Sequence, residues 1–200
     1  MAGLRKVQPT AVLPDIQLLF RAGSASARPY LPLLGTPVAD EFACRAVVLR
    51  PQSRGTITLR SADPRDPSRI EQNMLSTDYD RSMLRAGLRF AQELGLTAPV
   101  RAFVGREHSP PMSDFDKVDA YIRETAARGH HLVGTCRMGI DSDPAAVVDG
   151  NLRVRGVEAL RVIDASVMPD LVGGNIVAAI YMIAEKGADF IRGRSQAPAP

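Results

Sequence analysis

Two residues in the C-terminal third of the chain could take part in proton chemistry. His131 lies in the segment GHHLVGTCRMG, and Asn175 begins the apolar stretch NIVAAIYMIA. An imidazole can accept a proton near neutral pH, and a neutral amide can hydrogen-bond an oxygen atom without competing for that proton. The pair could therefore manage the proton of an alcohol while a cofactor takes up the hydride.

Each of these residues also has a structural interpretation. A single histidine followed by Leu132 and Val133 is more often a hydrogen-bonded core residue than a catalytic base. An asparagine that follows two glycines and precedes an apolar helix is a good N-cap, so the local pattern favours capping for Asn175. Capping and catalysis do not exclude each other.

Other short patterns nearby suggest metal or phosphate binding but lack essential parts. His130, His131 and Cys136 are possible ligands, yet adjacent histidines point apart and no fourth ligand is close in sequence. The glycine spacing of Gly134 to Gly139 resembles a phosphate loop without its Lys and Ser or Thr. Asp141 to Asp143 lacks the glycine and final glutamate of a calcium loop. We therefore predict two turns and no metal.

The N-terminal half predicts a sheet of hairpins. The segments Pro14 to Phe20, Phe42 to Leu49 and Gly55 to Ser61 are short, apolar or alternating, and bounded by Pro and Gly. The connection from Arg50 to Gly55 is short enough to join the last two strands as an antiparallel pair. The stretch from Ser61 to Asp78 is rich in Pro, Asp and Ser and predicts a loop.

Helices are expected at three places. Apolar residues recur at helical spacing after Thr77, which can cap that helix, and Gly95 suits a left-handed stop. Ser113 can cap a second helix that ends by Gly129. Residues 147–164 suggest two brief strands, and a last helix is expected from Asn175 to about residue 191.

Composition and charge exclude several classes of protein. The 200 residues are 45% hydrophobic and 24% charged, as in an ordinary globular domain. The net charge of +3 is dispersed along the chain, so nucleic acid is not an expected partner. The longest apolar stretch is too short for a transmembrane segment. Two cysteines without a disulfide pattern and the lack of an export signal favour the cytoplasm.

Several long motifs in a fixed order resemble the C-terminal region of the glucose-methanol-choline (GMC) family of FAD-dependent oxidoreductases. They are LRPQSRGTITLRSADPRDP, HLVGTCRMG, VVDGNLRVRGVEALRVIDASVMP and GNIVAAIYMIAEKGADFI. An ordered set of long motifs is far more specific than one short signature. The resemblance is strongest to the choline-dehydrogenase-like branch.

The resemblance implies roles for individual residues. His131 falls at the position of the family's catalytic histidine, and Asn175 at that of a second residue, His or Asn, which binds the substrate oxygen. Asp164 and Ala165 match a turn whose backbone follows the ribityl and phosphate chain of the flavin. Val177 matches a position whose amide faces the flavin pyrimidine ring.

The resemblance also implies an incomplete α+β fold. It comprises an antiparallel substrate-domain sheet packed with helices, together with the C-terminal strand and helix of an FAD-binding α/β domain. We assign residues 14–128 to the substrate-binding part and 129–193 to the catalytic and FAD-contacting part. Residues 1–13 remain unassigned, and 194–200 are expected to form a disordered tail. The GxGxxG fingerprint that holds the FAD pyrophosphate does not occur in the sequence.

The expected function is that of the C-terminal part of an FAD-dependent enzyme that oxidises a small-molecule alcohol. Such a part should be inactive without an N-terminal FAD-binding half, which a complementing chain could supply. Two alternatives remain open. One is a non-catalytic interaction module or inactive remnant, and the other is an activity like that of the hydroxynitrile lyases, without net redox change.

Overall fold

The computed structural model describes residues 2–23 and 41–194. These residues form two compact units. The first unit comprises Met1–Arg54 and Met74–Ala127, and the second comprises Gly55–Asn73 and Arg128–Pro200. The chain therefore passes from the first unit to the second and back before it enters the second unit again. The expected disordered tail, apart from Arg194, lies outside the described residues.

A three-stranded antiparallel sheet forms the base of the first unit. Its order is β1 (Ala2–Arg5), β2 (Ile16–Ala22) and β3 (Phe42–Val48). The sequence predicted β2 and β3 correctly. It did not predict β1, because a four-residue edge strand that is exposed throughout has no apolar alternation to reveal it.

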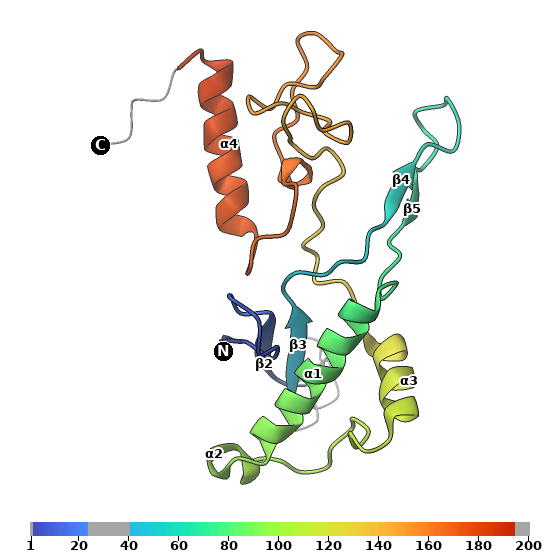
Figure 1. Ribbon diagram of the computed structural model, residues 1–200, viewed down its shortest axis with the longest axis vertical. Coiled ribbons are helices and arrows are strands. Elements are labelled where there is room, and N and C mark those ends of the chain that lie inside the picture. Colours follow the sequence, from blue (N-terminus) through green and yellow to red (C-terminus); the bar gives the residue numbers. More distant parts are fainter. Residues whose placement is uncertain (1, 24–40, 195–200) are drawn as a thin grey trace, which may run out of the picture. The chain divides into compact units, whose positions relative to one another are not determined.

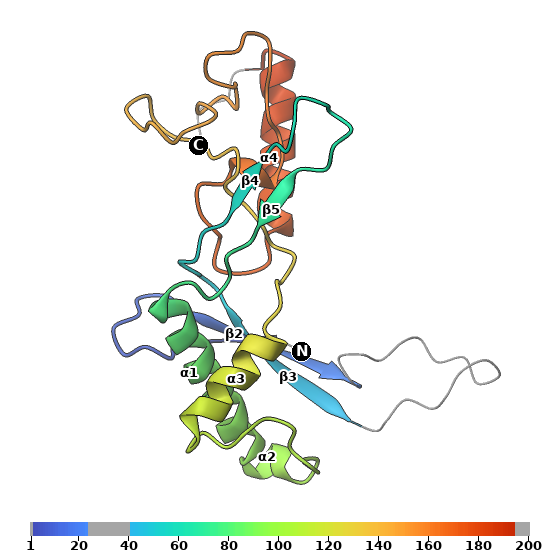
Figure 2. The same ribbon diagram turned by 90° about the vertical axis from the view of Figure 1, so that its right-hand side faces the viewer.

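One long helix covers one face of this sheet, as Figures 1 and 2 show. Helix α1 (Asp78–Gly95) packs its Met83 against Ile16 and Leu18 of β2, and all three side chains are buried. Helices α2 (Ala98–Arg101) and α3 (Phe115–Thr125) follow along the chain. Periodic apolar residues in α1 thus bury one stripe against the alternate residues of β2.

The helix ends agree only in part with the predicted signals. Thr77 caps α1 as predicted, since its hydroxyl accepts the amide of Asp80 at 3.2 Å. Gly95 is not a left-handed stop, because it is the last residue of α1 and the C-cap that follows it, Leu96, has right-handed geometry. The cap of α3 is Asp114 and not Ser113, and α3 ends at Thr125, before the predicted Gly129. A carboxylate one residue later outcompetes the serine hydroxyl as acceptor.

The predicted antiparallel pair of Phe42–Leu49 with Gly55–Ser61 is wrong. Strand β3 pairs with β2, and the connecting loop is held by the buried carboxylate of Asp80. This carboxylate accepts the amides of Gln52 and Ser53, each at 2.8 Å. The loop amides thus serve α1, and the chain continues into the second unit instead of folding back on β3.

The second unit contains a small hairpin of β4 (Thr56–Thr58) and β5 (Arg69–Glu71). Strand β5 lies within the stretch predicted as an uninterrupted loop, and this prediction is therefore wrong over three residues. Beside the hairpin, a Cβ atom on Gly55 would lie 2.2 Å from the carbonyl oxygen of Glu71. Only glycine permits that backbone approach.

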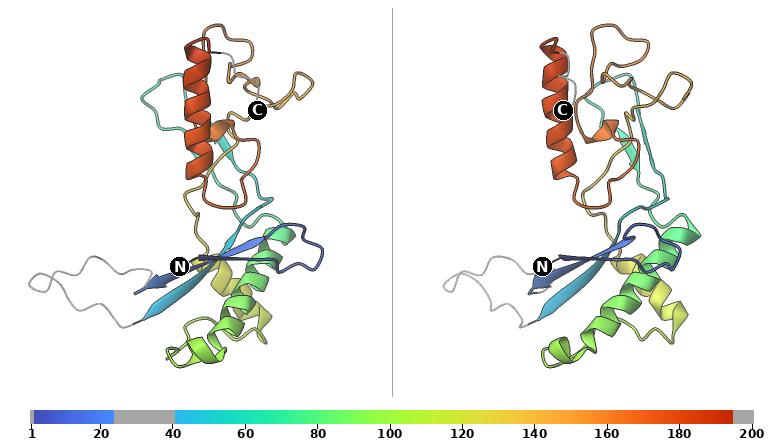
Figure 3. Two further views of the ribbon diagram at one scale, coloured as in Figure 1. Left: turned by 90° about the vertical axis from the view of Figure 1, so that its left-hand side faces the viewer. Right: turned by 60° about the vertical axis from the view of Figure 1, so that its left-hand side comes forward.

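The other described residues of the second unit form turns and two helical elements, and the long helix can be followed in Figure 3. The two helical elements are the short 3₁₀ helix η1 (Ala165–Val167) and α4 (Val177–Ile191). The two strands predicted within residues 147–164 form only isolated bridges, among them Arg153 with Arg161. Antiparallel sheets and helices together nevertheless confirm the predicted mixed fold class. No helix in the described ranges is long and apolar enough to cross a membrane.

Candidate functional site

Two of the sequence motifs are joined directly by backbone hydrogen bonds. The carbonyl oxygen of Ser166 accepts the amides of Gly134 at 3.1 Å and Cys136 at 3.0 Å, and the amide of Met138 donates to the carbonyl oxygen of Val167 at 2.8 Å. The loop that follows His131 is therefore fixed to the turn that begins at Asp164. Backbone pairing of this kind does not depend on side-chain identity.

The Asp164 turn is closed by its own side chain. The Asp164 carboxylate accepts the backbone amide of Ser166 at 2.8 Å and its hydroxyl at 2.5 Å, so it caps η1. Ala165 is half-buried and packs on the core, and Val167 is completely buried. The turn thus has a fixed shape, and its carboxylate is occupied within the turn.

His131 is positioned at the start of the loop and remains partly accessible. The preceding His130 adopts a left-handed conformation, with φ of 59°, which is uncommon outside glycine. His131 is half-buried, and its imidazole forms no hydrogen bond with the described residues. Its neighbour Leu132 is exposed. Among the described residues, His131 therefore has no partner that would make it a hydrogen-bonded core histidine.

Asn175 is exposed and does not cap α4. The N-cap is Ile176, and no side chain accepts a hydrogen bond from the first turn of the helix. The predicted cap is therefore wrong, and α4 begins two residues later than predicted. Buried Ile176 anchors the start of the helix to the core, so the shift has a packing cause. The Asn175 amide remains available to a ligand, beside helix amides that also lack a side-chain acceptor.

A single hydrophobic cluster lies beneath all three motifs. Its buried members include Val167 and Met168 of the turn and Ile176 at the start of α4, and Val133 of the histidine loop packs against them. His131, Asp164 and Asn175 are therefore each within three residues of the same core. This convergence of segments distant in sequence is the main evidence for a site.

Close packing of α4 fixes the helix to the segment before the turn. Gly187 is buried, and a Cβ atom there would lie 2.5 Å from Cγ2 of Ile163. Sequence reasoning missed Gly187, Ser166 and Ile176 as positioning residues. A small residue within an apolar helix could have signalled close packing at Gly187, but a backbone carbonyl acceptor such as that of Ser166 has no signal in the sequence.

The alternatives to a redox site gain no support from the described residues. Asp143 pairs with Arg137, and Asp141 pairs with Arg155 at 2.8 Å, so the residues of the possible calcium loop are already engaged. No group of three potential metal ligands is found in residues 2–23 and 41–194. Gly134, the first glycine of the phosphate-loop pattern, has a left-handed φ of 90°. This backbone conformation explains why glycine occupies the position.

Both cysteines are free thiols. Cys44 lies on β3 in the first unit, and Cys136 lies in the histidine loop of the second. Burial raises the pKa of the Cys44 thiol to about 11. At neutral pH Cys44 is therefore protonated and behaves as a core residue.

Comparison with known proteins extends the interpretation of the site. Residues 51–184 match the family model of the C-terminal domain of GMC oxidoreductases. The chain is 42% identical over 159 residues to the oxygen-dependent choline dehydrogenase of Stenotrophomonas maltophilia, covering 78% of this chain and 28% of that protein. It is 37% identical over 194 residues to the mitochondrial choline dehydrogenase of Homo sapiens, covering 96% of this chain and 32% of that protein.

Solved structures show the same relationship. Pyridoxine 4-oxidase from Mesorbium loti matches with a TM-score of 0.81 and 29% identity over 98% of this chain and 38% of that one. A formate oxidase variant from Aspergillus oryzae, studied for its FAD modification, matches with a TM-score of 0.78 and 29% identity. The match covers 91% of this chain and 32% of that one. The chain spans about a third of the length of the curated relatives named above.

Proposed function

The chain belongs to the GMC oxidoreductase family, and on this basis we propose that it forms the C-terminal part of an FAD-dependent enzyme that oxidises an alcohol. The observation that carries the proposal is the convergence of the His131 loop, the Asp164 turn and the start of α4 on one hydrophobic core. Each of these three segments carries a residue with a proposed role in binding or catalysis.

His131 acts as the base in this proposal. Removal of a hydride from an alcohol carbon leaves a carbonyl only if the hydroxyl proton is also lost. An imidazole that is partly accessible and not occupied by a hydrogen-bond partner among the described residues is free to accept that proton at a ring nitrogen. The backbone of the loop after His131 is held by the hydrogen bonds of Gly134 and Cys136 to Ser166.

Asn175 binds the substrate oxygen. Its amide is exposed and is not used as a helix cap, so its NH₂ group can donate to the oxygen of an alcohol. The amide is neutral at every working pH and does not compete with His131 for the proton. Its proposed task is therefore to position and polarise the hydroxyl group.

The residues present fit an FAD cofactor. The first turn of α4 has no side-chain cap, so its amides and the positive end of the helix dipole are available to the flavin pyrimidine ring. Val177 is the first helical residue, and the fixed turn at Asp164 and Ala165 offers backbone groups to the ribityl and phosphate chain. When bound, FAD supplies the acceptor for the hydride.

The first FAD-binding element must come from outside these 200 residues, because the sequence has no GxGxxG fingerprint. Helix α4 carries large apolar side chains that remain exposed, including Val177, Tyr181 and Met182. We propose that an N-terminal FAD-binding part, or a complementing chain that carries it, covers this surface.

Flavin content tests the proposal. The purified chain alone should show little absorption from oxidised flavin, and co-expression with a GMC N-terminal part should produce flavin bands that an alcohol bleaches. Stoichiometric flavin in the chain alone would contradict the requirement for that part. Flavin that an alcohol does not bleach in the complex would contradict alcohol oxidation.

Within a reducible complex, Asn175→Ala should raise the KM for the alcohol more than Asn175→His does.

A further inference from the structure

A basic groove in the second unit takes no part in the site described above. Its volume is about 560 Å³, within the range of small-molecule sites. Its lining carries four cations, and they come from Arg153, Arg161, Lys186 and Arg194. Arg153 and Arg161 are bridged to each other. Lys186 belongs to α4, and Arg194 follows that helix. Positive charge is thus gathered from segments that are distant in sequence.

Two of these cations face each other across an antiparallel bridge. Arg153 pairs with Arg161, and like charges placed directly opposite in such a pair repel each other. The Arg161 guanidinium donates to the carbonyl oxygen of Asn151 at 3.0 Å, which does not neutralise its charge. The nearby Asp149 carboxylate accepts the backbone amides of Asn151 and Arg153 through one oxygen and keeps its negative charge, but it forms no ion pair with Arg153 or Arg161. An anion between the two arginines would relieve their repulsion.

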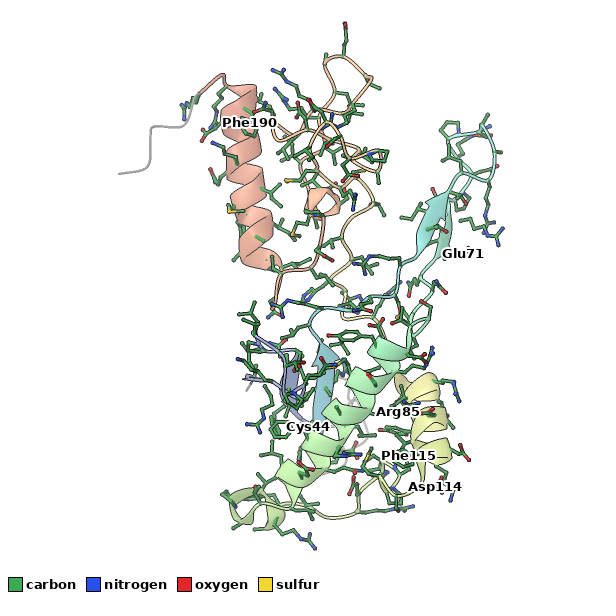
Figure 4. All side chains as sticks on the ribbon, in the orientation of Figure 1. Cys44, Glu71, Arg85, Asp114, Phe115 and Phe190 are labelled. Carbon is green, nitrogen blue, oxygen red and sulfur yellow. The ribbon has the colours of Figure 1, made fainter. Side chains whose placement is uncertain are left out.

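The remaining cations are also weakly compensated. Lys186 Nζ lies 5.0 Å above the ring centre of Phe190, which Figure 4 labels at the C-terminal end of α4. Arg194 approaches Asp189 at 3.9 Å, the outer limit of an ion pair, and both side chains are well exposed. Among the lining residues in the described part of the chain, none is acidic. The lining itself therefore carries a net positive charge, with the carboxylates of Asp149 and Asp189 beside it.

We propose that this groove binds a compact polyanion of the phosphate class, with the charge density of a pyrophosphate group. The planar guanidinium groups match phosphate oxygens in pairs, and a lysine adds a point charge. The four cations surround one small volume and do not form a stripe, so they suit a compact ligand better than an extended nucleic acid backbone.

The groove is separate from the candidate redox site. Asn175 precedes α4, whereas Lys186 lies nine residues after the first residue of the helix and Arg194 lies beyond its end. At 1.5 Å per residue Lys186 is about 14 Å along the axis from the start of α4, so a compact anion such as pyrophosphate at Lys186 does not reach Asn175. The inference therefore does not depend on the proposed oxidation of an alcohol.

Binding of pyrophosphate to the full 200-residue chain tests the proposal, with titration calorimetry as the measurement. The groove variant Arg153→Glu with Lys186→Glu should bind at least tenfold more weakly than the unaltered chain. The matched control is Arg89→Glu with Arg106→Glu, two exposed arginines of the first unit, which changes the net charge equally. The control should bind within twofold of the unaltered chain.

Other outcomes of this experiment would overturn the proposal or its assignment to phosphates. Equal weakening in both variants, or no binding to the unaltered chain, would overturn the proposal. Citrate that competes as strongly as pyrophosphate at matched ionic strength would overturn the assignment to phosphates. If circular dichroism shows that the groove variant is unfolded, Lys186→Gln alone should still weaken binding about threefold, and unchanged binding in it would overturn the proposal.

Discussion

The amide of Gly134 donates to the carbonyl oxygen of Ser166 at 3.1 Å. This contact fixes the loop that carries His131 to the turn that begins at Asp164, two segments about 30 residues apart in sequence. The orientation of the proposed base therefore depends on the shape of the proposed flavin-contacting turn. A change in the turn should affect both flavin binding and proton transfer.

The Asp164 carboxylate should stabilise this turn through its hydrogen bonds to Ser166. Asp164→Ala removes the acceptor for the Ser166 amide and hydroxyl, and we expect a loss of about 1 kcal/mol in the free energy of unfolding, as for other N-caps. Asp164→Asn keeps an acceptor oxygen and should lose less. Chemical denaturation of the two variants makes the comparison. Equal losses would show that the carboxylate oxygen does not stabilise the turn through these hydrogen bonds.

Gly187→Ala should destabilise the second unit by about 1–3 kcal/mol, because the added methyl group would lie 2.5 Å from Ile163. Gly105→Ala is the control, since a Cβ atom at that position would have no neighbouring atom within 4 Å. Ile163→Ala removes the clashing atoms and should make Gly187→Ala less costly in a double-mutant cycle. Additive losses would contradict close contact between α4 and Ile163.

Asp80 should make the stability of the first unit dependent on acid pH. Burial raises the pKa of its carboxyl, but hydrogen bonds from Ser53, Gln52 and Thr77 outweigh burial and leave the pKa lowered. The stabilisation is complete above the unfolded pKa of about 3.9 and is lost as pH falls through the lower folded value. Asp80→Asn should lose about 1–3 kcal/mol at pH 7 and show a smaller loss on acidification. Unfolding titrations at several pH values would show whether the two proteins differ in this way.

Cys44 should be nearly inert toward alkylating reagents in the folded chain. With a pKa of about 11, only about one thiol in a thousand is ionised at pH 8. In a Cys136→Ser variant, iodoacetamide should label Cys44 slowly in buffer and quickly in denaturant, as measured by mass spectrometry. Rapid labelling in buffer would show that the sheet face of Cys44 opens readily.

Local sequence signals predicted the elements whose determinants lie within a few residues. Thr77 caps α1 because its hydroxyl reaches an amide three residues away, and the alternation of Ile16 and Leu18 marks β2. Contacts over longer distances had no such signal. The Asp80 carboxylate captures amides 27 and 28 residues away, and this contact redirected the loop that the sequence predicted as a hairpin turn.

The candidate site was predictable as a set of motifs but not as an arrangement. The order of motifs pointed to His131 and Asn175, while their immediate neighbours favoured a core histidine and a helix cap. Burial of Ile176 moves the helix start beyond Asn175, and this packing effect cannot be deduced from the GGN pattern. The anchoring of the His131 loop on the Ser166 carbonyl likewise depends only on backbone geometry.

The rate of flavin reduction by an alcohol, measured by stopped flow in the reconstituted complex with the N-terminal part, tests the central claim most directly. His131→Ala should slow that rate by about two to four orders of magnitude, the range of general-base catalysis. His130→Ala is the matched control and should change it far less. A His131→Ala complex that binds flavin and is reduced at the unaltered rate would contradict the proposed role of His131.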